Sequence, residues 1–234
     1  MDFSKAGTND FKIENLSIDT SEIKCNKCKD TGYIFNKETY SAIKCTCLVE
    51  RQKSALPSLY ANKTFKDMDL SGYKNKENVK QVIEVIKKTN PYELKKGLYI
   101  QGDVGRGKTL LVACIFNHFI NSVSVKFVKV GDLMYKAREM FNGGEFDINI
   151  YKEIDILILD DFGVEKTTEF AEDILLNIIE YRYERQKPTY ITSNIPANKI
   201  IEMYPKHGRR LESRFIGENA MCMLLTLHGK DYRK

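Results

Sequence analysis

The sequence predicts an α/β fold with a mostly parallel sheet covered on both sides by helices. Two observations lead to this prediction. Short apolar runs alternate along the chain with longer segments whose apolar residues recur at helical spacing. The short runs contain few polar residues, as strands buried on both faces do, and the intervening segments are long enough to connect parallel strands. We therefore expect five parallel strands between two layers of helices.

The expected strands are the apolar runs at 97–101, 125–130, 154–159, 189–193 and 221–227. The expected helices lie at 76–88, 108–121, 131–142, 168–186 and 197–204. The first helix is amphipathic, because its apolar residues share one face, and Asn90-Pro91 ends it. Ligands of such folds bind at the carboxyl ends of the strands, so polar residues that follow the strands are the candidates for function.

The composition is that of one ordinary domain with a small appendage, at 42% hydrophobic and 29% charged residues. The longest uncharged apolar run, 110–120, is about half of the length that a bilayer requires, and the N-terminus has no apolar signal core. We therefore expect a cytoplasmic protein without membrane contact. The net charge of +5 permits a polyanionic partner without requiring one.

Composition also divides the chain into three parts. Residues 1–50 form a polar tail followed by a cluster of four cysteines. Residues 51–74 are mixed and are broken by Pro57 and Gly72, so we interpret them as a linker. The α/β domain is expected to cover 75–234.

A glycine-rich loop follows the first expected strand and fits the pattern G-x-x-x-x-G-K-[ST] without a mismatch. Its glycines let backbone N–H groups point inward at an oligophosphate, and the next helix adds its positive N-terminal end. Lys108 would contact the β and γ oxygens, and the Thr109 hydroxyl would be one ligand of a magnesium ion. The expected nucleotide-binding residues of this segment are Gly102, Asp103, Val104, Gly105, Arg106, Gly107, Lys108, Thr109 and Leu110.

Two carboxylates end the third expected strand. Asp160 and Asp161 follow four apolar residues, about fifty residues after Lys108, which is a Walker B pattern. Asp160 would hold magnesium through water, and Asp161, on the other side of the pleat, could orient or deprotonate an attacking water. The fourth strand ends in Asn194, whose amide can hydrogen-bond a γ-phosphate oxygen and that water, although a strand-to-helix turn would also explain it.

Four cysteines have the spacing of a metal site. The pattern Cys25-x2-Cys28-x16-Cys45-x-Cys47 supplies two close pairs of thiols across a span that can form a hairpin. Four thiolates suit a structural zinc ion. They also suit an iron–sulfur cluster, which residue identity alone does not exclude. A reversible disulfide at Cys25 and Cys28 is less well supported, because no thioredoxin-like strand and helix surround the pair. Cys114 and Cys222 lie alone in apolar stretches, so we expect them to pack as small hydrophobic residues.

In this order, the glycine-rich loop, the Asp-Asp strand, Thr192-Ser193-Asn194 and the segment 208–215 resemble the AAA+ ATPases of the DnaC/DnaI helicase-loader group. The related IstB transposition helpers are similar. The closing segment 229–233 resembles the end of loader domains, and 25–33 resembles the zinc knuckle of phage and Gram-positive loaders. The resemblance covers nearly the whole chain and implies a P-loop AAA+ fold that uses ATP and Mg²⁺, with Zn²⁺ in the knuckle.

The resemblance also implies roles for three arginines. Arg214 would be the arginine finger that enters the nucleotide site of a neighbouring subunit, which implies self-association. Arg233 matches a sensor-2 arginine acting in its own subunit, and Arg210 matches a neighbouring basic position. The expected catalytic set is Lys108, Asp160, Asp161, Asn194 and Arg214.

The function that the resemblance implies is ATP-dependent loading of a DnaB-type replicative helicase onto single-stranded DNA. Hydrolysis is expected to be slow and regulated by partners. The best candidate segment for DNA contact is 126–146, where lysines alternate with aromatic residues, although core packing explains that pattern equally well. Two alternatives are an IstB-like transposition helper, against which the knuckle argues, and a non-hydrolysing adaptor in which nucleotide supports the fold.

Overall fold

The computed structural model describes residues 24–163 and 168–233. It divides into two compact units that separate between Cys47 and Leu48. The N-terminal tail expected from the sequence lies almost entirely outside the described residues. In the part of the chain that the structure describes, no helix is both long and apolar enough to cross a membrane.

The second unit is built on five parallel strands, as predicted. They are β3 (Gly97–Gln101), β4 (Val125–Lys129), β5 (Ile156–Phe162), β6 (Thr189–Ser193) and β7 (Cys222–Thr226), in the order β4-β5-β6-β3-β7. The three central strands are almost entirely buried because both faces of the sheet are covered. The carboxyl ends of β3, β5 and β6 therefore meet at one edge, where the glycine-rich loop and both aspartates lie.

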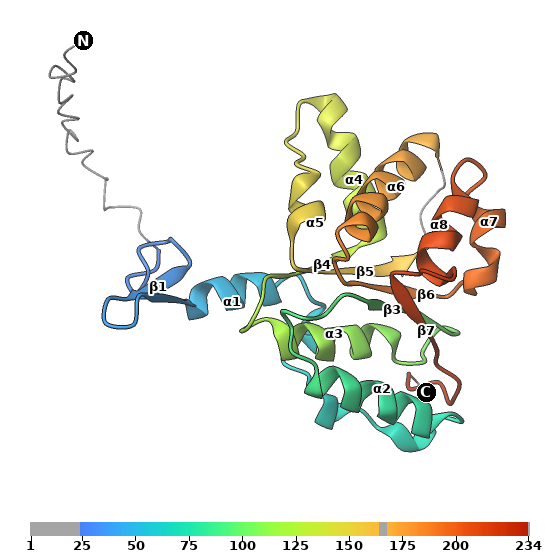
Figure 1. Ribbon diagram of the computed structural model, residues 1–234, viewed down its shortest axis with the longest axis horizontal. Helices are drawn as coiled ribbons and strands as arrows, with labels where there is room; N and C mark the ends of the chain where they lie inside the picture. Colours follow the sequence, from blue (N-terminus) through green and yellow to red (C-terminus); the bar gives the residue numbers. More distant parts are fainter. Residues whose placement is uncertain (1–23, 164–167, 234) are drawn as a thin grey trace, which may run out of the picture. The chain divides into compact units, whose positions relative to one another are not determined.

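Helices cover the two faces of this sheet (Figure 1). On one face lie α2 (Lys76–Lys88) and α3 (Lys108–Phe119), whose apolar residues pack against one side of the strands. On the other lie α4 (Val130–Glu139), α6 (Glu169–Glu184) and α8 (Gly208–Ile216). Helix α6, which lies between β5 and β6, and helix α8, which lies between β6 and β7, thus cover the same face of the sheet.

Several boundaries differ from the predicted ones. The helix predicted at 131–142 is α4 followed by a 3-10 turn (Met140–Asn142), because Gly143 takes φ +84° and ends it. The helix predicted at 197–204 is a 3-10 turn (Ala197–Lys199) that continues into α7 (Ile200–Met203). A short helix, α5 (Asn149–Glu153), was not predicted, since one and a half turns leave almost no periodic signal.

The segment interpreted as a linker has ordered turns and buried residues. It contains three 3-10 helices, at Ser58–Tyr60, Phe65–Asp67 and Leu70–Gly72. Leu56, Met68 and Tyr73 are buried in the same apolar cluster as α2 and α3. The segment therefore forms one wall of the α/β unit, at the edge of the sheet where α3 begins.

A fully buried arginine fixes the opposite edge of the sheet. The Arg182 guanidinium, on α6, donates to the Thr189 hydroxyl and to five backbone carbonyls, those of Tyr151, Lys152, Ile154, Asp155 and Pro188. Burial lowers its pKa to about 9. These bonds tie α6 to the starts of β5 and β6.

The first unit contains the predicted hairpin. Strands β1 (Tyr33–Asn36) and β2 (Ser41–Lys44) pair antiparallel, and α1 (Thr46–Lys53) follows. The two cysteine pairs flank the hairpin, as their spacing suggested. Cys114 and Cys222 are buried in the α/β unit, which confirms their expected packing.

Candidate nucleotide-binding site

The glycine-rich loop connects β3 to α3, as predicted. Gly105 and Gly107 take φ values of +79° and +80°, in the left-handed region where residues other than glycine are strained. Lys108 is the first residue of α3, so the loop leads directly into the N-terminal end of that helix. The arrangement is that of an anion site, with a curled loop and a helix end facing the same space.

The ammonium group of Lys108 lies at the centre of the loop and is nearly buried. It donates to the carbonyls of Gly102 (2.7 Å) and Asp103 (2.9 Å) and to the side-chain oxygen of Asn194 (2.6 Å). Burial lowers the pKa of Lys108, while the charges of Asp161 and Asp160 oppose that shift. The carboxyl end of β6 is therefore bonded directly to the loop.

Asp160 lies behind the loop and accepts hydrogen bonds from two hydroxyl groups. Thr109 donates to its carboxylate at 3.1 Å, and Thr192 donates at 2.6 Å. The carboxylate has no exposed surface, and burial is the main reason that its pKa is raised. The Thr109 hydroxyl and the Asp160 carboxylate are hard oxygen ligands at hydrogen-bond distance, so the residues present fit a magnesium ion.

Asp161 faces the same cleft as Lys108, although it follows Asp160 directly in a strand. Its φ of +56° is unusual for a residue other than glycine, and the pairing of β5 with β6 shifts register between Leu159 and Phe162. Its N–H donates to the Thr192 hydroxyl at 3.0 Å. The irregular backbone thus turns the second carboxylate toward the cleft instead of to the opposite face of the sheet.

Lys108, Thr109, Asp161 and Asn194 border one cleft with a volume of about 330 Å³, whereas Asp160 is fully buried and is not among its lining residues. Its lining includes loop and strand-end residues that the sequence analysis selected, namely Val104, Gly105, Arg106, Gly107, Lys108, Thr109, Leu110, Asp161, Asn194 and Arg233. Gly102 and Asp103 are not among its lining residues, and they contribute carbonyls to Lys108 instead. The two carboxylates, the lysine and the amide therefore come together as expected from their positions at strand ends.

Part of the cleft wall was not foreseen from the sequence. Leu59, Tyr60, Lys63, Met68 and Asp69 line it from the segment that was interpreted as a linker. Tyr73 and Tyr232 also line it, and Thr192 joins the two aspartates behind it. The sequence does not predict these contacts, because they depend on how distant segments pack together and not on a pattern within one segment.

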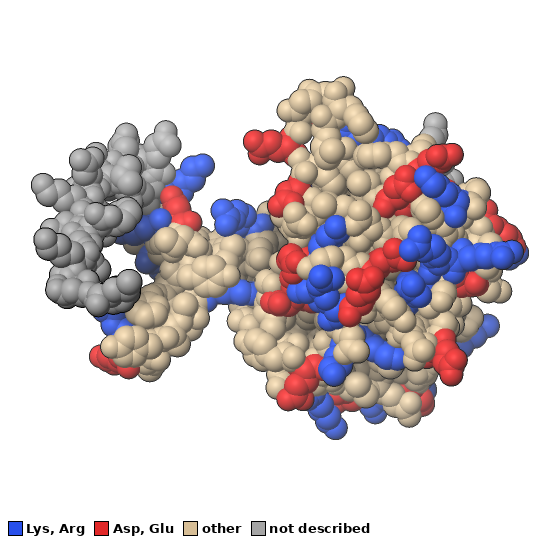
Figure 2. Space-filling view, turned by 45° about the horizontal axis from the view of Figure 1, so that its top comes forward, with Lys and Arg blue, Asp and Glu red and all other residues tan. Residues whose placement is uncertain are grey.

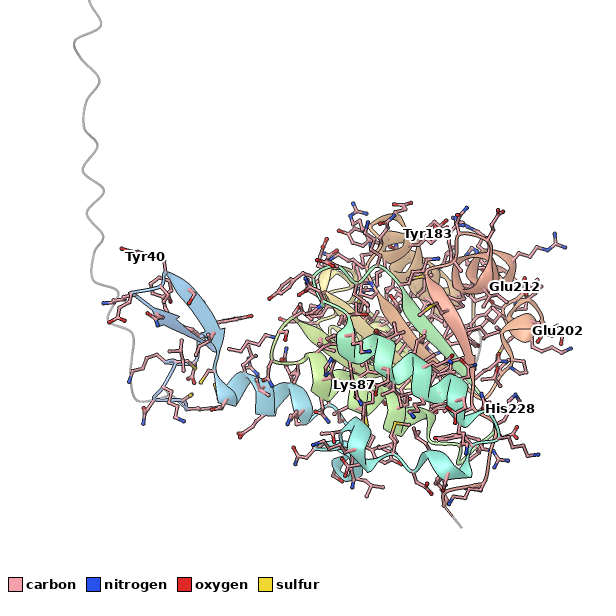
Figure 3. All side chains as sticks on the ribbon, turned by 60° about the horizontal axis from the view of Figure 1, so that its bottom comes forward. Tyr40, Lys87, Tyr183, Glu202, Glu212 and His228 are labelled. Atoms are coloured by element: carbon pink, nitrogen blue, oxygen red, sulfur yellow. The ribbon has the colours of Figure 1, made fainter. Side chains whose placement is uncertain are left out.

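Arg214 lies elsewhere on the same unit. Its guanidinium covers the ring of Tyr183 at 4.3 Å and lies 3.8 Å from the carboxylate of Glu180, both on α6. Arg210 pairs with the same carboxylate. Figure 3 shows Tyr183 well away from His228, which precedes the C-terminal residues that border the cleft. Arg214 is therefore not part of the nucleotide cleft of its own chain, whereas Arg233 is.

The candidate DNA segment divides between core and surface. Phe127 is buried, and Phe146 stacks on Tyr151 at 5.8 Å. Tyr135, in α4, and Phe141, in the turn that follows it, are exposed. Figure 2 shows positive and negative side chains interspersed over the presented face of the α/β unit. That face carries no broad cationic surface of the kind that binds nucleic acid without sequence preference.

The four cysteines of the first unit converge on one point. Their sulfur atoms all lie within 4.8 Å of one another, with Cys25 and Cys45 3.8 Å apart and Cys28 and Cys47 3.4 Å apart. Tetrahedral Zn–S bonds place sulfur atoms about 3.8 Å apart. Clusters hold their cysteines further apart, because iron and sulfide lie between them. The residues present therefore fit a single tetrahedral ion.

The local backbone favours the thiolate form of Cys25. The pKa of Cys25 is lowered to about 6, chiefly by a hydrogen bond with the backbone amide of Cys28 and then by one with the Cys47 thiol. The pKa of Cys47 is raised, chiefly by its hydrogen bond with Cys28 and then by burial. Amides that point at a sulfur atom are the usual outer shell of a thiolate site, since they stabilise negative charge.

The buried carboxylate of Asp160 leads to a prediction about stability. Because the folded pKa is raised, the folded chain binds more protons than the unfolded chain between the two pKa values, so the free energy of unfolding falls as pH rises through that range. At neutral pH that cost is fully present. We expect Asp160→Asn, which keeps an oxygen for both threonine hydroxyls, to raise the free energy of unfolding by about 1 kcal/mol and to abolish ATP hydrolysis.

Chemical denaturation at pH 7.5 and pH 4.5 tests this expectation. The gain in stability of Asp160→Asn over the natural chain should shrink at the lower pH. Asp173→Asn is the control, because Asp173 is an exposed acid whose pKa is lowered by His207 and then by Lys206. A gain that is independent of pH, or a loss at pH 7.5, would contradict the role of burial.

Comparisons with known proteins agree with the fold and with the loop. The replicative helicase loader DnaI of Bacillus subtilis is 26% identical over 174 residues, which cover 70% of this chain and 56% of DnaI. The replicative helicase loader DnaC of Buchnera aphidicola is 26% identical over 191 residues, or 78% of this chain and 74% of that protein. The chain thus matches little more than half of the length of DnaI.

A solved structure of DnaI superposes with a TM-score of 0.63 at 25% identity, and the match covers 78% of this chain and 100% of that one. These likenesses confirm the predicted P-loop AAA+ fold class. The family model for the IstB-like ATP binding protein matches residues 15–206. Because that match covers most of the chain, the protein belongs to the family of IstB-like ATP-binding proteins.

Proposed function

We propose that the protein is an ATP-hydrolysing helicase loader that helps to place a DnaB-type replicative helicase on single-stranded DNA in the cytoplasm. The observation that carries this proposal is the convergence of Lys108, Thr109, Asp161 and Asn194 on one cleft, with Asp160 bonded to Thr109 behind it. The matched proteins named as replicative helicase loaders support the choice of partner.

In this proposal a triphosphate replaces the internal partners of Lys108. Its ammonium group has three N–H donors, and all three are used within the chain, by two loop carbonyls and by Asn194. The β and γ oxygens would compete for these donors, and Asn194 would turn to the γ-phosphate. Because such contacts exist only with triphosphate bound, hydrolysis changes the state that the loop and β6 favour.

The carboxylates would do the remaining chemistry. Thr109 and Asp160 would hold a magnesium ion, which when bound neutralises charge that develops on the phosphates. Asp161 faces the cleft beside Lys108 and would orient the attacking water or accept its proton. Its strained backbone supports a functional role, since residues held at positive φ cluster at active sites.

We assign Arg214 to the nucleotide site of a neighbouring copy. Arg214 is not among the residues that line its own cleft, and this supports the assignment, because a finger that acts between subunits must lie outside its own site. Its Nε atom is buried and has no hydrogen-bond partner among the described residues. The ring of Tyr183 and the carboxylate of Glu180 would hold the guanidinium in place until a neighbour arrives.

The helicase contact is assigned to the cysteine module with zinc bound. The hairpin between the cysteine pairs exposes the side chains of Tyr33, Phe35, Tyr40 and Ile43, and Figure 3 shows Tyr40 projecting from it. Exposed apolar patches on small modules commonly mark protein interfaces. Zinc would hold the short hairpin in shape without an apolar core.

The decisive experiment mixes the purified chain with a DnaB-type helicase and ATP and measures the complex by native mass spectrometry. We expect a defined complex, and helicase transferred to single-stranded DNA when ATP is present. The combined variant Tyr33→Ser, Phe35→Ser, Tyr40→Ser should lose the complex while it keeps its bound zinc and its ATP affinity.

The same mixture separates the alternatives. A transposition helper of the IstB kind would bind a transposase and leave the helicase on its own. A non-hydrolysing adaptor would bind ATP without releasing phosphate, even in the presence of single-stranded DNA. Either result would replace the loader proposal, although the nucleotide site would stand in both.

A further inference from the structure

A phosphate loop binds oligophosphate with its N–H groups, so its carbonyls must face away and find other partners. In this chain five loop carbonyls have partners: those of Gly102 and Asp103 accept from Lys108, that of Gly105 accepts from Tyr232, that of Arg106 accepts from Tyr73, and that of Gly107 accepts from Leu111. Among the described residues, no backbone N–H from Asp103 to Gly107 donates to another backbone group. The carbonyls of the loop therefore have partners within the chain, whereas its N–H groups have no backbone partner among the described residues.

Tyr73 is the first of two groups that support these loop carbonyls. It is 5% exposed, and its hydroxyl donates to the Arg106 carbonyl at 2.9 Å. A Cβ atom on Gly107 would lie 2.6 Å from the same hydroxyl, so the phenol is in close contact with the loop at two successive residues. Burial raises the pKa of Tyr73, so it remains a protonated donor at neutral pH.

The C-terminal segment is the second support. The N–H of Tyr232 donates to the Gly105 carbonyl at 3.0 Å, and Arg106 donates to the carbonyl of Gly229. A Cβ atom on Gly105 would lie 1.9 Å from a carboxylate oxygen of Asp231. Residues 229–232 thus lie against the loop at Gly105 and Arg106.

The two supports also hold each other. The backbone N–H of Lys74 donates to the His228 carbonyl at 2.7 Å, and the backbone N–H of Lys230 donates to the Gly72 carbonyl at 3.0 Å. The rings of Tyr73 and Tyr232 lie 5.4 Å apart. The segments before α2 and after β7 therefore form one clamp on the loop, although they are far apart in the sequence.

We propose that Tyr73 and the amide of Tyr232 are positioning groups that set the phosphate loop in its nucleotide-binding shape before nucleotide arrives. The inference rests on the proposed ATP-binding function and deepens it, because affinity for the phosphates then depends on the clamp. Without an outer partner, the peptide of Arg106 can rotate so that its carbonyl points into the cleft. Each such rotation replaces a donor to phosphate with an oxygen that repels it.

Two conservative variants test the role of Tyr73. Tyr73→Phe removes the hydroxyl that holds the loop, and we expect a roughly fivefold to tenfold loss of affinity for ATP and ADP. Tyr92→Phe is a matched control, since it also removes a phenol that donates to a backbone carbonyl, in this case that of Ser122, and Tyr92 does not line the cleft. It should keep the ATP affinity of the natural chain.

The readout compares ATP with AMP by calorimetry, together with the melting temperature of each variant. AMP lacks the phosphates that such a loop grips, so Tyr73→Phe should leave its affinity unchanged. Equal losses for ATP and AMP, or equal losses in both tyrosine variants, would show a merely structural role and overturn the inference. A natural chain that binds no ATP would overturn the proposed function and the inference together.

A second substitution probes the other support independently. Tyr232→Pro removes the N–H that donates to Gly105, whereas Tyr232→Phe retains it. We expect the proline variant to lose ATP affinity by a similar factor and to keep its affinity for AMP. Full ATP affinity in a folded Tyr232→Pro chain would exclude a role of that amide.

Discussion

Lys108→Ala is expected to reduce ATP affinity and turnover by about 100-fold or more. The physical reason is the position of the ammonium group, which lies at the centre of the loop within 2.9 Å of three oxygen acceptors. Its charge also balances Asp160 and Asp161, so the variant would leave two carboxylates facing an anionic ligand. Nucleotide titration and phosphate release measure the two losses separately.

Mixing variants shows whether the loss is local to the nucleotide site. Arg214→Ala should bind ATP normally and fail to hydrolyse it, because Arg214 lies outside its own cleft. A mixture of Lys108→Ala and Arg214→Ala chains should regain part of the activity, since the first supplies the finger and the second supplies the loop. Full activity of Arg214→Ala alone, or no recovery in the mixture, would contradict hydrolysis between neighbouring copies.

Cys45→Ser is expected to remove essentially all bound zinc. Cys45 has no exposed surface, and its sulfur lies 3.8 Å from that of Cys25. Three thiolates and a hydroxyl bind zinc far more weakly than four thiolates do. We expect the hairpin to lose its protection from proteases while ATP affinity persists, because the nucleotide cleft is lined entirely by residues of the second unit.

Metal content measured by plasma mass spectrometry tests this expectation. Cys114→Ala is the matched control, since Cys114 is equally buried but belongs to the α/β core, where burial raises its pKa to about 12. It should keep the zinc content of the natural chain. Iron together with acid-labile sulfide in the natural chain would contradict a single-ion site.

The sequence alone was sufficient for the sheet and for the chemistry at its edge. Apolar runs with few polar residues locate strands that are buried on both faces, and all five were found where they were expected. Parallel strands bring their carboxyl ends to one edge, so residues separated by about fifty positions could be assigned to one site. Cysteine spacing likewise predicted a cluster, because pairs on either side of a hairpin must converge.

Tertiary structure decided everything that depends on contacts between distant segments. The clamp of Tyr73 and Tyr232 joins residues from the two ends of the α/β unit, and no pattern within either segment predicts that they contact each other. The orientation of Asp161 depends on a left-handed backbone, which strand alternation predicts incorrectly. Local patterns follow from backbone geometry within a few residues, whereas the packing that positions a phosphate loop, or moves Arg214 away from it, exists only in the folded chain.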